Sequence, residues 1–181
     1  MEVPDQRLPA ATFDELALPL FDQLYNFARW LTHDTTEAED LVQETYAKAL
    51  RGFSSFQAGT NFRAWMYRIL RNSFLSSRTG LKATVVFDES DSETIVPAES
   101  STPESLLLER ANREMVQLAL EELPVHFREI LLLCEVEEMS YQEIAETLAI
   151  KTGTVMSRLF RARKALRLVL EEKLKGAPHG V

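Results

Sequence analysis

Apolar residues recur every three or four positions in several stretches of the chain, and this spacing predicts amphipathic helices. The first stretch spans residues 13 to 31 and consists of Phe13, Leu16, Leu20, Leu24, Phe27 and Leu31. Pro19 falls inside it. We expect this proline to limit or kink the opening turn, because proline lacks the N–H that an interior helical position uses.

A second helix is predicted from Glu37 to Phe53, begun by a capping box of Thr36 and Glu39. Its apolar stripe is expected to be buried and contains Ala38, Leu41, Val42, Ala49, Leu50 and Phe53. Carboxylates near a helix N-terminus stabilise it by about 0.3–1 kcal/mol each, which accounts for Glu37 and Glu39.

The face of this second helix that points away from the stripe combines polar and small residues: Asp40, Gln43, Glu44, Ala47 and Arg51. Helix-dipole compensation explains the first three less well than it explains Glu37 and Glu39. A contiguous polar triad beside a small residue also makes a good surface for docking another protein.

A third helix, rich in aromatic residues, follows a loop with glycine and serine and is capped by Asn61. Four residues are expected to fill a core: Phe62, Trp65, Ile69 and Phe74. Others supply cations, a ring and an amide elsewhere on the helix: Arg63, Tyr67, Arg68, Arg71, Asn72 and Arg78. Arginines among aromatics suit single-stranded nucleic acid, because bases stack on rings at about 1–3 kcal/mol each while cations follow the phosphates. Core packing is the alternative for Phe56, Trp65 or Tyr67 taken singly.

The stretch from 83 to 112 has the composition of a flexible connection. It holds seven acidic residues against Arg110 alone, a balance of -6 within a chain of net charge -8. Its serine- and proline-rich core lacks a sustained apolar period. The short β-like run from Ala83 to Phe87 is isolated, so the sequence predicts an all-α protein of two small helical domains on a flexible acidic linker.

The most informative pattern lies between Ser140 and Arg167. Ser140 and Glu143 form a capping box for one helix, and Thr152 or Thr154 begins a second after a turn near Gly153. The second helix buries Val155, Leu159, Ala162 and Leu166. Five residues are expected on its opposite side: Thr154, Ser157, Arg158, Arg161 and Lys164.

This second helix is basic within an acidic chain. From Thr147 to Leu170 there are six lysines or arginines and no acidic residue. A solvated basic face explains charge of this kind equally well. Combined with a helix-turn-helix pattern, the charge favours DNA binding, with the second helix in the major groove.

The remaining composition excludes several classes. One cysteine, Cys134, permits no disulfide framework or thiolate zinc site, and it is expected to be a buried thiol, with redox sensing as the alternative. Three scattered histidines predict no metal site. The acidic N-terminal stretch does not resemble a signal peptide and no apolar run approaches a membrane span, so we expect a cytoplasmic protein without membrane insertion.

Three segments in order resemble the extracytoplasmic function, or group IV, sigma factors of bacterial RNA polymerase. AEDLVQETYAKAL is similar to the family's core-docking segment, NFRAWMYRILRN to its promoter-melting segment, and SYQEIAETLAIKTGTVMSRLFRARKAL to its reader of the -35 element. The resemblance implies sigma region 2 over residues 12–80, a linker over 81–103 and sigma region 4 over 104–175.

The resemblance also implies which residues act. Those facing the polymerase clamp helices are Asp40, Leu41, Gln43, Glu44, Tyr46 and Lys48. Those at the -10 element are Phe56, Asn61, Trp65, Tyr67, Arg68, Arg71 and Asn72, with the loop from Ser54 to Thr60 helping Asn72 to capture a flipped base. Those at the -35 element are Thr152, Thr154, Ser157, Arg158, Arg161 and Lys164. Met156 stands where many relatives carry an arginine, which puts the inherited contact there in doubt.

The implied function is an alternative sigma factor that directs promoter recognition, melting and initiation for a stress-responsive regulon. Its implied partners are the clamp helices and flap of core RNA polymerase, promoter DNA, and an anti-sigma factor of a subgroup that includes zinc-binding members. No cofactor is implied for this chain. The acidic linker would either occupy the positive polymerase cleft or act as a solvated spacer.

Two other classes of function were weighed. A DNA-binding regulator acting alone on an operator would share the helix-turn-helix, but it would leave AEDLVQET and the aromatic helix without a purpose. An enzyme has little support, because the sequence has no P-loop, dinucleotide fingerprint, metal-ligand cluster or nucleophile elbow.

Overall fold

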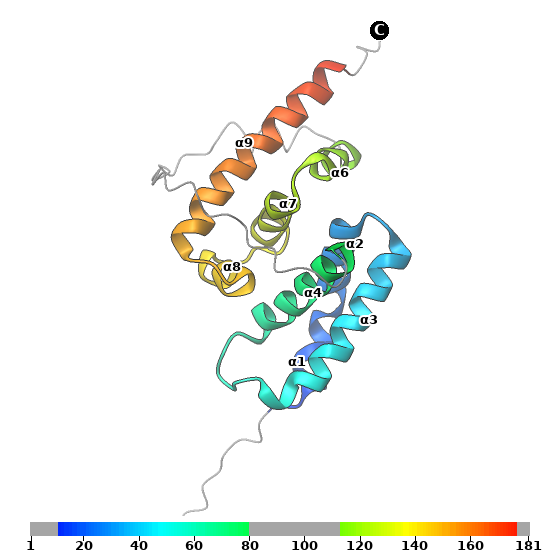
Figure 1. The fold of residues 1–181 in the computed structure, drawn as a ribbon, viewed down its shortest axis with the longest axis vertical. Coiled ribbons are helices and arrows are strands. Elements are labelled where there is room, and N and C mark those ends of the chain that lie inside the picture. Colours follow the sequence, from blue (N-terminus) through cyan, green and yellow to red (C-terminus); the bar gives the residue numbers. More distant parts are fainter. Residues whose placement is uncertain (1–10, 80–112, 177–181) are drawn as a thin grey trace, which may run out of the picture.

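The computed structural model of this chain describes residues 11–79 and 113–176, and within those ranges every regular element is a helix (Figure 1). The elements form two halves, α1 to α4 below and α6 to α9 above in the view of Figure 1. The all-α expectation is therefore confirmed. The expected linker at 81–103 lies outside the described residues.

The N-terminal half contains α1 (Phe13–Ala17), a 3₁₀ turn η1 (Leu18–Leu20), α2 (Phe21–Thr32), α3 (Thr35–Gly52), a 3₁₀ turn η2 (Phe53–Ser55) and α4 (Phe62–Thr79). Pro19 lies in η1, so the predicted first helix is divided where the proline was expected to disturb it.

The start of α3 differs from the prediction. Asp34 is the N-cap, and its Oδ1 accepts a hydrogen bond from the backbone N–H of Glu37 at 2.8 Å. The capping box assigned to Thr36 and Glu39 is wrong. Aspartate is as good an N-cap as threonine, and the cap sits two residues earlier because the helix begins at Thr35.

The core of this half comes from α2, α3 and α4. Leu24, Phe27 and Leu31 of α2 are buried against Leu41 and Val42 of α3, as the apolar stripes predict. Burial of side chains of this size stabilises by about 1.5–3 kcal/mol each. Leu50 does not follow the expectation. It is 60% exposed near the C-terminal end of α3.

The C-terminal half contains α6 (Arg113–Glu122), α7 (Val125–Leu131), a π-helical turn η3 (Leu132–Val136), α8 (Tyr141–Leu148) and α9 (Thr152–Gly176). The capping box of Ser140 and Glu143 is present at the start of α8. Ala149 makes the turn before α9 with a left-handed φ of 55°, whereas Gly153 lies inside the first turn of α9.

The stripe predicted for α9 is confirmed. Val155, Leu159, Ala162 and Leu166 are buried against α7 and α8. The helix continues past this domain core to Gly176, with Leu170 also buried. A helix-turn-helix of α8 and α9 is therefore present.

The two halves pack against each other, an arrangement the sequence did not predict. The helix α8 lies against α4, and α7 lies against α2. Buried residues of both halves belong to one continuous hydrophobic cluster. The surface where the two halves meet is therefore buried and belongs to the same hydrophobic core as the interior of each half.

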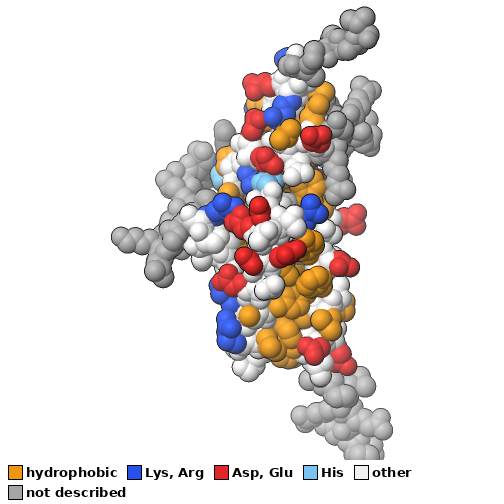
Figure 2. Space-filling model, turned by 90° about the vertical axis from the view of Figure 1, so that its right-hand side faces the viewer, with side chains coloured by type: hydrophobic (Ala, Val, Ile, Leu, Met, Phe, Trp, Pro, Cys, Tyr) orange, Lys and Arg blue, Asp and Glu red, His pale blue; other side chains and the backbone are white. Residues whose placement is uncertain are grey.

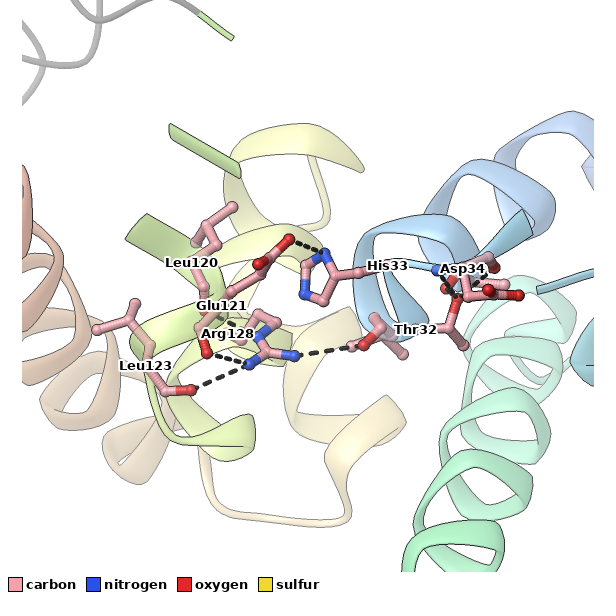
Figure 3. Close-up of polar contacts among 9 residues, drawn as sticks. Thr32, His33, Asp34, Leu120, Glu121, Leu123 and Arg128 are labelled. Carbon is pink, nitrogen blue, oxygen red and sulfur yellow. Dashed lines mark hydrogen bonds and ion pairs between the residues drawn. The ribbon is translucent and has the colours of Figure 1, made fainter. Parts of the chain in front are cut away.

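Polar contacts reinforce this boundary (Figure 3). His33 follows α2 in a left-handed conformation, and its Nδ1 lies 3.0 Å from Glu121 Oε1 at the end of α6. Arg128 of α7 spans the same boundary and donates to the carbonyl oxygen of Leu31 at 3.3 Å. Among the described residues, no helix is long and apolar enough to cross a bilayer.

Candidate functional site

The polar face of α3 is exposed as predicted. Asp40, Gln43, Glu44 and Lys48 are all solvent-accessible, whereas Leu41 is buried beneath them. Lys48 Nζ lies 2.5 Å from Glu44 Oε1 one helical turn away, and it also donates to Ser73 Oγ of α4 at 3.0 Å. The face therefore presents carboxylates and an amide on a rigid helix.

Tyr46 borders this face and is half-buried. Its hydroxyl donates to the carbonyl oxygen of Ala17 at 2.7 Å, which ties α3 to α1. Burial, together with the negative charge of Asp22, raises the pKa of Tyr46 to about 12. The phenol thus stays neutral and keeps donating across the physiological range.

An apolar edge adjoins the acidic face, and the sequence reasoning missed it. Leu18, Phe21 and Leu50 are exposed, and the ring of Phe21 lies 5.9 Å from that of Tyr46. Figure 2 shows hydrophobic side chains gathered over the half that contains α1 to α4, with acidic groups around them. Exposed apolar patches of this kind commonly mark protein interfaces. Leu50 was the residue that could have revealed this edge from the sequence, but its spacing was interpreted as part of the buried stripe of α3.

A cluster of aromatic rings lies where α3 ends and α4 begins. Phe56 is 5.1 Å from Trp65 and 5.2 Å from Phe62, measured between ring centroids. All three rings are half-buried, so they combine core packing with accessible edges. The loop between them bends at Gly59, whose φ of 89° is a conformation that other residues rarely adopt.

Asn61 caps α4 as predicted. Its Oδ1 accepts from the backbone N–H of Ala64 at 3.0 Å. Its Nδ2 donates to Glu143 Oε1 at 3.2 Å, and Glu143 belongs to α8 in the other half. The cap thus also joins the two halves.

Three further residues proposed for the -10 element are bound by the C-terminal half. Tyr67 donates to Glu137 Oε2, Arg68 donates to the carbonyl oxygen of Glu146, and Arg71 forms a two-pronged ion pair with Glu129 at 2.7 and 3.0 Å. Of the two readings of Tyr67, its place among the groups outside the core is wrong and the alternative of core packing is confirmed. Its side chain is 0% exposed and packs on the ring of Phe27 at 5.1 Å.

The chemistry of this contact is that of a buried polar network. Burial raises the pKa of Glu137 above the usual value for a glutamate, while the hydrogen bond from Tyr67 and the charge of Arg63 act in the opposite direction. Burial likewise raises the pKa of Tyr67, with the hydrogen bond to Glu137 as the next cause. Arg63 completes the group by donating to the carbonyl oxygen of Glu137 at 2.7 Å. Asn72, the last proposed -10 residue, is exposed.

The helix α9 presents a second polar face. Arg161 and Lys164 are exposed on it, and Thr154 and Ser157 are half-buried there, while Thr152 is exposed where the helix begins. Thr154, Ser157, Arg161 and Lys164 recur at intervals of three or four residues and so share one side of the helix, whereas Thr152 does not share that spacing.

The structure contradicts the predicted position of Arg158. It is only 7% exposed, so its predicted place on the open side of α9 is wrong. Burial, followed by the charges of Arg158 and Arg161, lowers the pKa of His126 on α7, the helix that packs against α9. The helical position alone did not reveal that α7 covers this part of α9.

Among the residues described, no three histidine, cysteine or acidic side chains gather into a group that could hold a metal ion. Cys134 is half-buried, and burial raises the pKa of its thiol. A thiol with a raised pKa is less often in its reactive thiolate form.

Two family models match the chain, one in each half. Residues 19–83 match the family model of Sigma-70 region 2, and residues 113–166 match the model of Sigma-70, region 4. The architecture and these matches define a two-domain helical protein of the sigma-70 type. The chain belongs to the extracytoplasmic function (ECF) sigma factors of the sigma-70 family.

Individual relatives cover both halves. The chain is 37% identical over 168 residues to the ECF RNA polymerase sigma factor SigE of Mycolicibacterium smegmatis, covering 87% of this chain and 64% of that protein, so it spans just under two thirds of that relative's length. It is 30% identical to the RNA polymerase sigma-H factor of Pseudomonas aeruginosa, covering 95% of this chain and 93% of that protein.

The fold is similar to a solved sigma factor. The sigma factor RpoE from Bartonella quintana, determined in complex with the anti-sigma factor NepR, matches with a TM-score of 0.65 and 30% identity. The match covers 88% of this chain and 96% of that chain, and so extends over both halves.

Proposed function

We propose that this protein is an alternative sigma factor, which binds core RNA polymerase and directs recognition, melting and initiation at promoters of a stress-responsive regulon. Region 2 would extend over residues 12–80, a linker over 81–103 and region 4 over 104–175. The observation that carries the proposal is the presence, in one chain of this family, of an acidic and apolar docking face on α3 and a basic helix-turn-helix face on α9.

The face of α3 would dock on the polymerase clamp helices. Asp40, Gln43 and Glu44 are exposed there, and they adjoin the apolar edge of Phe21 and Leu50. An interface core that excludes water, with charged groups at its rim, is the usual construction of a specific protein contact. The exposed side chain of Leu50 would give this interface apolar area, which the acidic residues alone do not supply.

The two DNA elements would be read by different helices. In region 2, the ring cluster around Phe56 and Trp65, together with Asn72, would stack and hold an unpaired base of the -10 element. The unstacking cost of a few kcal/mol would then be offset by new contacts. In region 4, the exposed side of α9 would face the -35 major groove and its phosphates, with Arg161 and Lys164 as its cations.

We further propose that an anti-sigma factor holds this protein until a stress signal arrives, because the similar RpoE of Bartonella quintana was solved with the anti-sigma factor NepR. A zinc-binding anti-sigma factor would supply its own zinc ligands. The protein would act in the cytoplasm, bind no cofactor and catalyse no reaction of its own.

Binding to core RNA polymerase tests the proposal. Fluorescently labelled protein is titrated with purified bacterial core enzyme, and its DNA binding is measured with and without core. We expect saturable binding to core and promoter binding that requires core. A chain that ignored core but shifted particular duplexes by itself, as a dimer, would be a regulator acting alone.

A further inference from the structure

Two large apolar side chains border the polar face of α9. Met156 is half-buried, and Phe160, one turn further along, is 42% exposed. They directly precede Ser157 and Arg161, so the apolar pair runs along the helix beside a polar pair. The hydrophobic core cluster of the described residues includes Val155 of this helix but neither Met156 nor Phe160. The core of this half therefore does not account for them.

The charge around these two side chains favours a nucleic acid as their partner. The stretch from Thr147 to Leu170 holds six lysines or arginines and no acidic residue, and Arg161 and Lys164 are exposed. Such a surface attracts phosphates. We propose that Met156, flanked by Phe160, recognises the methyl group of a thymine in the -35 element. This inference rests on the proposed function of α9 and adds the base pair that the two side chains select.

The chemistry of methionine fits thymine better than the other bases. In the major groove thymine presents a C5 methyl group, which the other three bases lack. Arg161 can donate to O6 and N7 of a guanine, whereas Met156 has no N–H to donate. Its thioether is unbranched and polarisable, so it adapts to the surface that it meets. Met156 therefore gains most from burying a methyl group.

The neighbouring Ser157 strengthens the preference for an A·T pair. Its hydroxyl donates to the carbonyl oxygen of Thr154 at 3.2 Å, so toward DNA the oxygen acts as an acceptor. Adenine N6 is a donor in the same groove, on the base pair that carries the thymine methyl group. A G·C pair also has an amino donor but lacks the methyl group. Met156 and Ser157 thus match the two distinguishing groups of one A·T pair.

The start of α9, the part that a helix-turn-helix brings to the base edges, is bare at Gly153. This residue precedes Met156 by three positions and Phe160 by seven, a spacing that places all three on one side of the helix. Gly153 is exposed, its backbone is helical, and a Cβ added there would meet nothing within 4 Å. Neither space nor conformation therefore requires glycine, although alanine favours a helix more. The missing side chain does allow another molecule, such as a DNA groove, to approach the backbone closely.

The central test removes one methyl group from the DNA. Holoenzyme formed from the full-length protein and bacterial core RNA polymerase binds fluorescent fragments of a promoter on which it initiates. Each thymine of the -35 element, on either strand, is replaced in turn by deoxyuridine. We expect at least one replacement to lower the affinity about fourfold, which is the effect of leaving a buried methyl group exposed. Equal affinity for every fragment, or a -35 element without an A·T pair, would overturn the proposal.

A change in the protein must remove the same response. Met156→Ala with Phe160→Ala removes the apolar surface, so this double variant should bind the thymine and deoxyuridine fragments equally well. The matched control is Met156→Leu with Phe160→Leu, which keeps apolar side chains at both positions and should keep the response. Both variants should fold, because the two side chains lie outside the core cluster. A loss that persisted in the alanine variant would come from the stiffness of the duplex itself and would overturn the proposal.

Two further variants separate direct contact from general effects. Leu174 is exposed on the same side of α9 as Met156, about 27 Å further along the helix, and Leu174→Ala should leave affinity and response unchanged. Gly153→Ala should keep or raise the melting temperature but lower the affinity for the thymine fragment, because its methyl group would occupy space that the groove needs. Unchanged affinity of Gly153→Ala, or a loss in Leu174→Ala equal to that of the alanine double variant, would overturn the proposal.

Initiation by wild type on the unmodified promoter precedes these comparisons, and its absence would refute the proposed function. Normal initiation without any response to deoxyuridine would refute only the recognition of thymine. Binding of the alanine double variant to core polymerase alone is measured as well and should match that of wild type. If that binding were lost, the two side chains would dock on the polymerase and not on DNA, which would also overturn the proposal.

Discussion

Arg128 on α7 donates a hydrogen bond to the carbonyl oxygen of Leu31 on α2, with Nη1 3.3 Å from the oxygen. The same guanidinium donates to the carbonyl oxygens of Leu120, Glu121 and Leu123, which satisfies the C-terminal end of α6 (Figure 3). The buried side chain of Arg128 therefore supplies hydrogen-bond donors to the carbonyl groups at the end of α6 and links this part of the chain to the other half of the molecule. Its role is structural, because these bonds hold α7 to the end of α6 and to α2.

Arg128→Ala should lower the free energy of unfolding. A buried carbonyl left without a partner costs about 1–3 kcal/mol, and this change removes the donor of several. Urea denaturation followed by circular dichroism measures the effect. Lys164→Ala, at an exposed position, is the control and should stay within about 0.5 kcal/mol of wild type. Equal losses for the two variants would show that the Arg128 contacts contribute nothing.

Asp40→Arg with Glu44→Arg should weaken binding to core polymerase by at least an order of magnitude. The change reverses charge on the exposed face of α3, and it places an arginine beside Lys48 in place of the exposed Glu44–Lys48 pair. Such pairs contribute about 0–1 kcal/mol, so the melting temperature should change little. Fluorescence anisotropy with labelled core gives the affinity.

The matched control for this variant carries the same charge change elsewhere. Glu114→Arg with Glu172→Arg alters two exposed carboxylates of the C-terminal half. It should bind core as wild type does. If both double variants bound equally well, α3 would not be the docking face.

Asn72→Ala should impair opening of the -10 element. Asn72 is exposed on α4, next to Arg71 in the sequence, and under the proposed function its amide would hydrogen-bond a flipped base. Loss of that bond leaves part of the unstacking cost of a few kcal/mol uncompensated. A fluorescent base analogue in the -10 region, monitored with the polymerase holoenzyme, should brighten several-fold less than with wild type. Ser76→Ala, one turn further along α4, should open normally, and normal opening by Asn72→Ala would remove its role.

His126 should make the protein less stable in mild acid. Burial, followed by the charges of Arg158 and Arg161, lowers the pKa of this histidine in the folded state below its ordinary value of 6.5. A lowered folded pKa means that stability is fully present above pH 6.5 and is lost as the pH falls through the folded pKa. Melting temperatures of wild type should therefore fall between pH 7.5 and 5.5 by more than those of His126→Gln. His33 has a pKa shifted in the same direction, so the comparison with the variant isolates His126. Parallel curves for the two proteins would contradict this assignment.

Local patterns predicted the helices well. The Ser140–Glu143 box, the Asn61 cap and the buried stripe of α9 depend on residues within one or two turns, where sequence spacing fixes the geometry. The N-cap of α3 was assigned to the wrong residue because Asp34 and Thr36 are both good N-caps. Spacing alone did not show that the helix begins at Thr35, directly after Asp34.

Side-chain environments set by distant parts of the chain were predicted less well. Tyr67 was grouped with the arginines, with core packing as the alternative, and the sequence did not reveal that Glu137, seventy residues away, gives its hydroxyl a buried partner. Arg158 is only 7% exposed although its spacing put it on the open side of α9, a helix that packs against α6, α7 and α8. Leu50 fits the apolar stripe of α3 by spacing but lies beyond the helices that would cover it. No local pattern encodes contacts between the two halves.

Transcription by reconstituted holoenzyme tests the central claim most directly. Purified protein is mixed with bacterial core RNA polymerase and a library of promoter-sized fragments, and the 5′ ends of the transcripts are sequenced. We predict initiation that requires both components, at fragments sharing one pair of -35 and -10 sequences. The absence of transcripts with core, or the same start sites when this protein is omitted, would contradict the assignment of a promoter-directing sigma factor.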